Sequence, residues 1–262
     1  MTLSIALRGD TTRFPGNTLP ALRSALRAGV DLVKIDVHLT SDGYPVLVDE
    51  RVVALPGSEP RRIGDLTLAE LAGARENVER RVPTLMEVLS EFLGRETTPL
   101  MIDAASPEAA LAADTVLREH GFVDQALFTG PVEALQALRA RRPATPMMLS
   151  WDQPGPPPED LARSLRPTFL GKHYTLLDRE TVGEMHRFGY RVVAWTVNEF
   201  PEMARLIGMG VDAIATERVD DLVSLTSGRA QGPSSHGDPA SSPVPQVSPG
   251  AAGPDRHTEG PV

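Results

Sequence analysis

The sequence contains no cysteine among its 262 residues, so the chain forms no disulfide, offers no thiolate to zinc and has no thiol nucleophile. It also lacks any run of about 20 apolar residues, the length that a membrane-spanning helix needs, so we expect no membrane span. The first residues, MTLSIALRG, have neither a basic start nor a long apolar stretch, and we expect no signal peptide. These absences predict a cytoplasmic protein.

Positive charge is scarcer than negative charge, because 26 Lys and Arg residues stand against 35 Asp and Glu residues, for a formal net charge of -9. An acidic chain has no general attraction to nucleic acid or to anionic membranes, so neither is an expected partner. The abundance of Ala, Arg, Pro and Gly is typical of chains from GC-rich bacterial genomes.

Apolar segments typical of strands alternate with amphipathic segments typical of helices from Leu3 to Ser227. This alternation predicts the α/β class and a single-domain (β/α)8 TIM barrel over residues 1–226. Beyond it the composition shifts to Pro, Ser, Gly and Ala without aromatic residues, so we expect residues 227–262 to form a disordered tail.

The strands and helices of this barrel can be assigned from the same periodicity. We expect strands at residues 3–7, 30–37, 99–104, 125–128, 146–149, 168–170, 190–197 and 211–215. We expect helices at residues 19–28, 107–120, 131–140 and 178–188, and a further helix that begins with a capping box formed by Thr84 and Glu87.

The stretch from Val30 to Asp49 carries the most informative pattern. A β-branched, apolar run is followed by the tight turn Ser41-Asp42-Gly43 and by a second short strand. Because side chains alternate along a strand, three ionisable residues share one face: Lys34, Asp36 and His38. In a parallel barrel that face points inward, near the mouth where such barrels have their active sites.

This stretch resembles the motif (I/V)-E-x-D-V-x-x-T-x-D-G-x-x-V-x-x-H-D of the glycerophosphodiester phosphodiesterase family. The matching residues are Asp36, Val37, Thr40, Asp42, Gly43, Val46 and Asp49. Arg8-Gly9 resembles the end of the family's H-R-G, Pro15-Gly16-Asn17-Thr18 its P-E-N-T, and Trp195-Thr196-Val197-Asn198 its W-T-V-N. The resemblance extends over residues 3–225 and implies the TIM barrel fold.

The resemblance also implies a reaction, the hydrolysis of phosphodiesters in lipid metabolism. The family uses Ca²⁺ or Mg²⁺ held by three carboxylates, two His residues as acid and base, and an Arg and a Lys around the phosphate. In this sequence Leu7 and Val48 stand at the two His positions, and Ala105 stands at the Lys position. The three carboxylate positions hold Lys34, Asp36 and Asp103, and the Arg is present as Arg8.

Lys34 leads to a specific hypothesis about the metal site. Two unit charges about 4 Å apart interact by roughly 4 kcal/mol at an effective dielectric constant near 20, and a divalent ion doubles that repulsion. We expect the Lys34 ammonium to lie near the metal position, neutralised by Asp36 and Asp103. No metal is therefore expected, although Ca²⁺ or Mg²⁺ would be needed if the family's reaction were retained.

Other residues near the barrel mouth could take part in binding or proton transfer. His38 and His173 are candidates for a rebuilt acid–base pair, with structural roles as the alternative for both. Arg8 could bind an anion or form a salt bridge with Asp36 or Asp10. Lys172 is a further candidate ligand-binding cation, and Trp195 either walls the pocket or belongs to the core. His120 and His186 end helices and are interpreted as structural.

Three functions remain open at this point. The first is a pseudoenzyme or anion-binding barrel, with Arg8, Lys34 and Lys172 around a phosphodiester or another anionic small molecule. The second is an enzyme, either an active phosphoric diester hydrolase with a rebuilt acid–base pair or a barrel recruited to another reaction. The third is a scaffold that acts through its surface or its tail.

Overall fold

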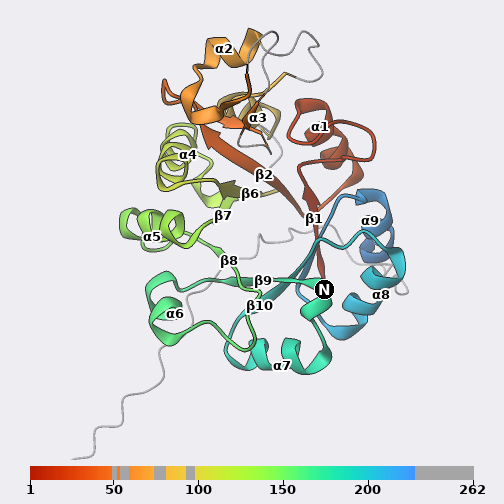
Figure 1. Ribbon diagram of the computed structural model, residues 1–262. Coiled ribbons are helices and arrows are strands. Elements are labelled where there is room, and N and C mark those ends of the chain that lie inside the picture. Colours follow the sequence, from red (N-terminus) through yellow and green to blue (C-terminus); the bar gives the residue numbers. More distant parts are fainter. Residues whose placement is uncertain (49–51, 54–58, 74–80, 93–97, 228–262) are drawn as a thin grey trace, which may run out of the picture.

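The computed structural model describes residues 1–48, 52–53, 59–73, 81–92 and 98–227. Eight parallel strands in this part of the chain form a nearly closed barrel, and Figure 1 shows the helices arranged around them. The barrel strands are β1 (Leu3–Leu7), β2 (Leu32–Leu39), β6 (Leu100–Ala104), β7 (Ala126–Thr129), β8 (Met148–Ser150), β9 (Phe169–His173), β10 (Arg191–Trp195) and β11 (Ala213–Thr216). The predicted (β/α)8 barrel is confirmed.

The strands follow the order β7-β6-β2-β1-β11-β10-β9-β8, so the first and last strands of the chain, β1 and β11, lie side by side. A parallel bridge between Phe128 of β7 and Met147, the residue before β8, closes the ring. The antiparallel strand β3 (Pro45–Leu47) pairs with the end of β2 and forms the predicted hairpin. A separate two-stranded sheet joins β4 (Val52–Val53) and β5 (Arg61–Arg62).

The helices in the described part of the chain are α1 (Leu19–Ala28), α2 (Leu68–Gly73), α3 (Leu85–Phe92), α4 (Pro107–Glu119), α5 (Val132–Arg141), α6 (Glu159–Leu165), α7 (Arg179–Arg187), α8 (Phe200–Met209) and α9 (Val219–Ser227). Several helices begin at a residue whose side chain caps them, among them α1 at Thr18, α4 at Ser106 and α7 at Asp178. The predicted capping box before α3 is present, since Thr84 N–H donates to Glu87 Oε2 at 2.9 Å and Glu87 N–H donates to Thr84 Oγ1 at 3.2 Å. Gly29 ends α1 at a φ of 81°, a backbone conformation that favours glycine.

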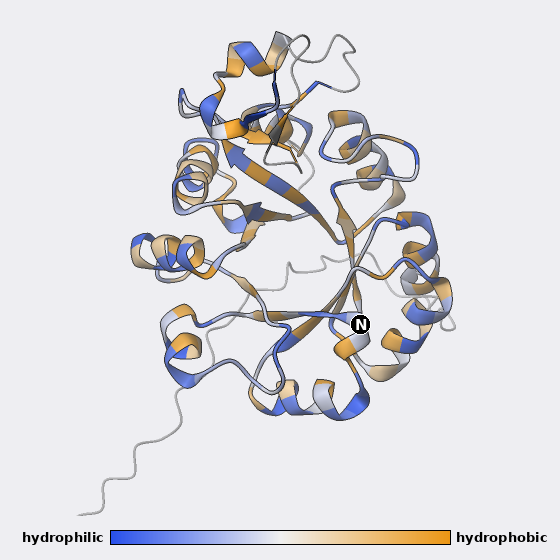
Figure 2. Cartoon of the chain, viewed as in Figure 1, coloured by the Kyte–Doolittle hydropathy of each residue, from blue (hydrophilic) through white to orange (hydrophobic). Residues whose placement is uncertain are grey.

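The alternation of side chains along the strands produces two cores. Ile5, Leu32, Met101, Phe169 and Val193 belong to a cluster inside the barrel. The outward faces of the same strands pack against the helices, and on β2 these are Val33, Ile35 and Val37. Figure 2 shows the resulting alternation of hydrophobic and hydrophilic residues along β2. The inward face of β2 turns polar beyond Leu32, which brings charged side chains to one end of the barrel.

Two parts of the chain discussed in the sequence, the tail and Asp49, fall outside the described residues or nearly so. The predicted tail, residues 227–262, lies outside the described residues except for Ser227, which ends α9. Asp49, which matches the family motif, also lies outside them. In the described part of the chain, no helix has the length and apolar character required to cross a membrane.

Candidate functional site

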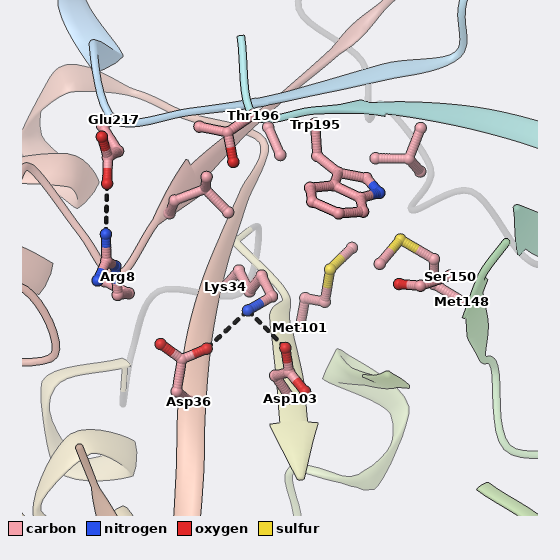
Figure 3. Close-up of a pocket in the computed structure, with 13 residues that line it drawn as sticks. Arg8, Lys34, Asp36, Met101, Asp103, Met148, Ser150, Trp195, Thr196 and Glu217 are labelled. Carbon is pink, nitrogen blue, oxygen red and sulfur yellow. Dashed lines mark hydrogen bonds and ion pairs between the residues drawn. The ribbon is translucent and has the colours of Figure 1, made fainter. Parts of the chain in front are cut away.

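A cavity of about 290 Å³ lies at the end of the barrel where the parallel strands finish. Its charged half is formed by Arg8, Lys34, Asp36, Asp103 and Glu217, as Figure 3 shows. Its other half is mostly apolar, and the remaining lining residues are Leu7, Met101, Met148, Ser150, Val193, Trp195, Thr196 and Ala215. These residues come from β1, β2, β6, β8, β10 and β11 or directly follow them, so the closed barrel is what brings them together.

Lys34 is at the centre of the charged half. Its Nζ atom lies 2.6 Å from Oδ1 of Asp36 on the same strand and 2.7 Å from Oδ2 of Asp103 on the neighbouring strand β6. Both ion pairs that the sequence predicts for Lys34 are therefore present. Burial opposes the charge on Lys34, but the carboxylates of Asp103 and Asp36 outweigh burial and raise the pKa of the ammonium. Lys34 is thus held in its protonated form.

Arg8 makes a different ion pair from the ones predicted. Its guanidinium is paired with Glu217, the residue after β11, rather than with Asp36 or Asp10. Glu217 is held in turn by Asn198, whose Nδ2 donates to Oε2 at 2.9 Å and whose Oδ1 accepts the Glu217 N–H at 3.0 Å. Asp10 is buried elsewhere, where it accepts hydrogen bonds from the hydroxyls of Thr12 and Ser24, both at 2.6 Å.

The divalent cation implied by the resemblance can be tested against these donors. A metal at this position would need several oxygen ligands with open lone pairs, but a protonated amine lies between the two available carboxylates. In the part of the chain that the structure describes, no group of three or more His, Asp or Glu side chains is placed to hold a metal ion. The residues present at this site do not fit the metal.

The two positions that correspond to the family's His residues have different surroundings. Leu7 lines the cavity at the end of β1. Val48 is 3% exposed and belongs to a separate apolar cluster with Val46, Ile63 and Leu71, so its side chain does not line the cavity. Neither side chain can transfer a proton.

Three predicted site residues lie outside the cavity lining. Lys172 is 2% exposed and donates from Nζ to the backbone carbonyl of Gln153 at 2.6 Å, and its burial lowers its pKa. His173 forms a 2.7 Å hydrogen bond between Nδ1 and Thr175 Oγ1. His38 lies opposite Val46 in the hairpin. The expected grouping of Lys172 with Arg8 and Lys34 is therefore wrong, and the catalytic roles suggested for His38 and His173 stay predictions.

Trp195 lines the cavity, in agreement with the first of its two predicted roles. Its ring packs on the apolar cluster inside the barrel and meets His173 edge-on at a centroid distance of 5.6 Å. The two helix-terminal His residues bond within the scaffold. His120 Nδ1 lies 2.9 Å from the Val116 carbonyl, and His186 Nε2 lies 2.8 Å from Asp212 Oδ2.

Several lining residues were not singled out in the sequence. Glu217 ends the segment Gly210-Val-Asp-Ala-Ile-Ala-Thr-Glu217, which resembles the family's G-V-D-G-I-x-T-D, and Thr196 stands in the segment that resembles W-T-V-N. The motif matches alone could therefore have pointed to both residues. Met101, Met148 and Ser150 lie in ordinary strand sequence, where only the alternation of inward and outward positions could have identified them.

Comparison with known proteins gives consistent results. The Glycerophosphoryl diester phosphodiesterase family matches residues 8–221. A glycerophosphodiester phosphodiesterase of Caldanaerobacter subterraneus is 26% identical over 237 residues, which cover 86% of this chain and 97% of that protein. A probable glycerophosphodiester phosphodiesterase of Mycobacterium tuberculosis is 25% identical, with 87% of this chain and 92% of that protein covered.

Among solved structures, a phosphodiesterase of Oleispira antarctica in complex with the product sn-glycerol-3-phosphate superposes with a TM-score of 0.77. It is 24% identical, and the match covers 87% of this chain and 97% of that one. A glycerophosphodiester phosphodiesterase of Thermotoga maritima gives a TM-score of 0.70 at 24% identity, with 86% and 98% covered. At these identities the structural likeness establishes the shared barrel.

Proposed function

Because the chain belongs to the glycerophosphoryl diester phosphodiesterase family but carries an ammonium group between its two remaining metal-site carboxylates, we propose that it is a pseudoenzyme of that family. In this proposal metal-dependent phosphodiester hydrolysis is lost and the barrel binds a small molecule in its cavity. The single observation that carries the proposal is the placement of Lys34 Nζ within 2.7 Å of both Asp36 and Asp103.

Electrostatics supports the loss of the metal. An ammonium and a divalent cation about 4 Å apart repel by roughly 8 kcal/mol at an effective dielectric constant near 20. Asp36 and Asp103 are already neutralised by Lys34, so a metal would also have to compete for their lone pairs. Because its pKa is raised, Lys34 does not escape this competition by deprotonating at neutral pH.

The proton-transfer groups support the same proposal. Leu7 and Val48 replace the acid and the base that the family's reaction requires. Lys34 cannot serve as a base because it is held protonated, and both Asp36 and Asp103 are engaged with it. Around the described cavity, the remaining carboxylate is Glu217, which is paired with Arg8.

A second candidate is an active phosphoric diester hydrolase with a rebuilt acid–base pair. Two observations favour it: Arg8 lines the cavity at the position of the family's phosphate-binding Arg, and the Caldanaerobacter relative is named as a glycerophosphodiester phosphodiesterase. His38 and His173 are the residues proposed for the new pair, although neither lines the cavity in this arrangement.

The ligand of the barrel is proposed to be small because the cavity of about 290 Å³ is at the low end of the usual range for small-molecule sites. A phosphodiester or another anion is the class of ligand that family membership suggests, and the Oleispira structure contains the product sn-glycerol-3-phosphate. In this chain an anion would have to compete with Glu217 for Arg8 and with two carboxylates for Lys34.

The test is a calorimetric titration of the chelator-stripped protein with Ca²⁺ and Mg²⁺, followed by an assay of glycerophosphodiester hydrolysis. We expect no binding at millimolar metal and no turnover. Lys34→Glu should gain metal affinity because it supplies the third carboxylate, whereas the matched control Lys34→Met removes the ammonium without adding a ligand and should gain less. Micromolar binding to the natural sequence at about one site per chain, with turnover, would overturn the proposal.

A further inference from the structure

The cations of the cavity are already balanced by its own carboxylates. Two cations and three carboxylates line the described cavity, so its formal charge is -1 when all are ionised. Lys34 contacts two of the carboxylates, and Arg8 is paired with the third. A phosphate group entering this cavity would meet an excess of negative charge and would have to break an existing ion pair to gain a cation.

Uncharged hydrogen-bonding groups remain available in the same cavity. Ser150 and Thr196 both line it, and neither hydroxyl has a hydrogen-bond partner in the described part of the chain. Asp103 contacts Lys34 through Oδ2, and within the described residues its Oδ1 is an open acceptor on a side chain that is 34% exposed. Figure 3 shows Ser150 and Thr196 on either side of the Trp195 ring, with Asp103 and Lys34 facing the space between them.

The rest of the lining is suited to C–H groups. Trp195 and Leu7 pack with Met101 and Met148 in the apolar cluster inside the barrel and present this surface to the cavity. Indole rings and thioethers make favourable contacts with apolar groups of irregular shape. The cavity therefore offers an apolar wall together with two hydroxyls and a carboxylate oxygen at its edge.

We infer that the ligand of this cavity is a neutral polyhydroxylated molecule, a sugar or polyol, and not a phosphate ester. Its C–H groups would lie against Trp195 and the methionines, and its hydroxyls would bond Ser150, Thr196 and the open oxygen of Asp103. The inference rests on the proposed loss of the metal, because a divalent cation would reverse the sign of the charge in the cavity. A neutral ligand would bind in this way without breaking the ion pairs that Lys34 and Arg8 form in the cavity.

The experiment titrates the full-length protein with glycerol, myo-inositol and D-glucose, and separately with glycerol 3-phosphate and inorganic phosphate, by ligand-observed NMR at low and high salt. We expect at least one neutral polyol to bind with an affinity unchanged by salt, and at least tenfold more tightly than either anion. Salt independence is expected because screening acts on charged partners and not on neutral ones. Tighter binding of an anion, or no binding of any of the three polyols, would overturn the inference.

Substitutions of two lining residues test whether the polyol binds in this cavity. Thr196→Val and Ser150→Ala should each weaken polyol binding by about three- to tenfold, the usual value of one neutral hydrogen bond. The matched control is Ser90→Ala, since the Ser90 hydroxyl donates to the Met86 carbonyl of its own helix, and it should leave binding unchanged. Equal effects of all three variants would place the polyol elsewhere and overturn the assignment.

Failure of the inference about the ligand can be distinguished from failure of the proposed function. Metal binding and turnover of a glycerophosphodiester are measured on the same preparation. Turnover with bound metal contradicts the proposed function itself. Absence of metal binding together with preferential binding of phosphate contradicts only the inference about the ligand.

Discussion

Asn17 bonds Asp36 with both ends of its side-chain amide. Its Nδ2 donates to Oδ2 of Asp36 at 3.0 Å, and its Oδ1 accepts the backbone N–H of Asp36 at 3.1 Å. The pair fastens the loop between β1 and α1 to β2 and leaves the other oxygen of Asp36 directed at Lys34. Asn17 is therefore a positioning residue for the ion pairs at the centre of the cavity.

Asn17 should stabilise the barrel in two ways, through its hydrogen bonds and through its tolerance of a positive φ, and two substitutions separate these contributions. Asn17→Ala removes both hydrogen bonds and places alanine at a φ of 57°, so we expect a loss of about 2–4 kcal/mol in the free energy of unfolding. Asn17→Gly removes the same bonds but accepts the positive φ, and its loss should be smaller. Urea denaturation measures the free energy of unfolding of each variant. Equal losses of this free energy would show that the backbone conformation at position 17 contributes nothing.

Lys34 should make the stability of the protein depend on alkaline pH. Its folded-state pKa is raised above the ordinary value of 10.5, because Asp103 and Asp36 outweigh the effect of burial. Its contribution is then complete below the unfolded-state pKa and is lost as pH rises through the folded-state pKa. We expect the unfolding free energy of the natural sequence to fall above about pH 10.5 for this reason.

Lys34→Met is the variant that isolates this dependence. It leaves Asp36 and Asp103 without their shared cation, so it should cost about 2–4 kcal/mol in the free energy of unfolding at neutral pH. The difference in unfolding free energy between natural protein and variant should shrink above the ordinary lysine pKa. A difference that stays constant up to pH 12 would contradict the assignment of the pKa shift to Lys34.

Restoring histidine should have unequal costs at the two family positions. Val48 is 3% exposed within an apolar cluster, so Val48→His buries an imidazole without a defined partner and should destabilise the fold by about 2–3 kcal/mol. Leu7 faces the cavity, so Leu7→His should cost about 1 kcal/mol or less. Chemical denaturation compares the two, and similar losses would mean that the Val48 site can open to solvent.

The central ion pairs could be predicted from the sequence because strand alternation places Lys34 and Asp36 on one face, and the family resemblance assigns Asp103 to the same site. Val33, Ile35 and Val37 must face the helices, so the alternating positions Lys34 and Asp36 must face the barrel interior. Parallel pairing of β2 with β6 then aligns Asp36 with Asp103, which brings the second carboxylate to the same ammonium.

The placement of Lys172 could not be predicted by the same rule, because the strand was expected to end at residue 170. The structure continues β9 to His173, which makes Gly171 and His173 the inward positions and turns Lys172 to the outer face. The Arg8–Glu217 pair was missed for another reason. The two residues are 209 positions apart and meet only because β1 and β11 are neighbours in the closed barrel.

Trp195 provides a final prediction about the cavity wall. Its Nε1 atom is buried and has no hydrogen-bond partner in the described part of the chain, a condition that costs about 1–3 kcal/mol relative to a satisfied N–H. Trp195→Phe removes the unsatisfied N–H, which should stabilise the fold, and removes part of the ring, which should destabilise it. The two effects should nearly cancel and leave the unfolding free energy within about 1 kcal/mol of that of the natural protein. Trp195→Ala removes the whole ring from the apolar cluster and should cost about 3–4 kcal/mol. Guanidinium denaturation of the two variants separates these effects, and a Phe variant as unstable as the Ala variant would show that the indole N–H is satisfied in solution.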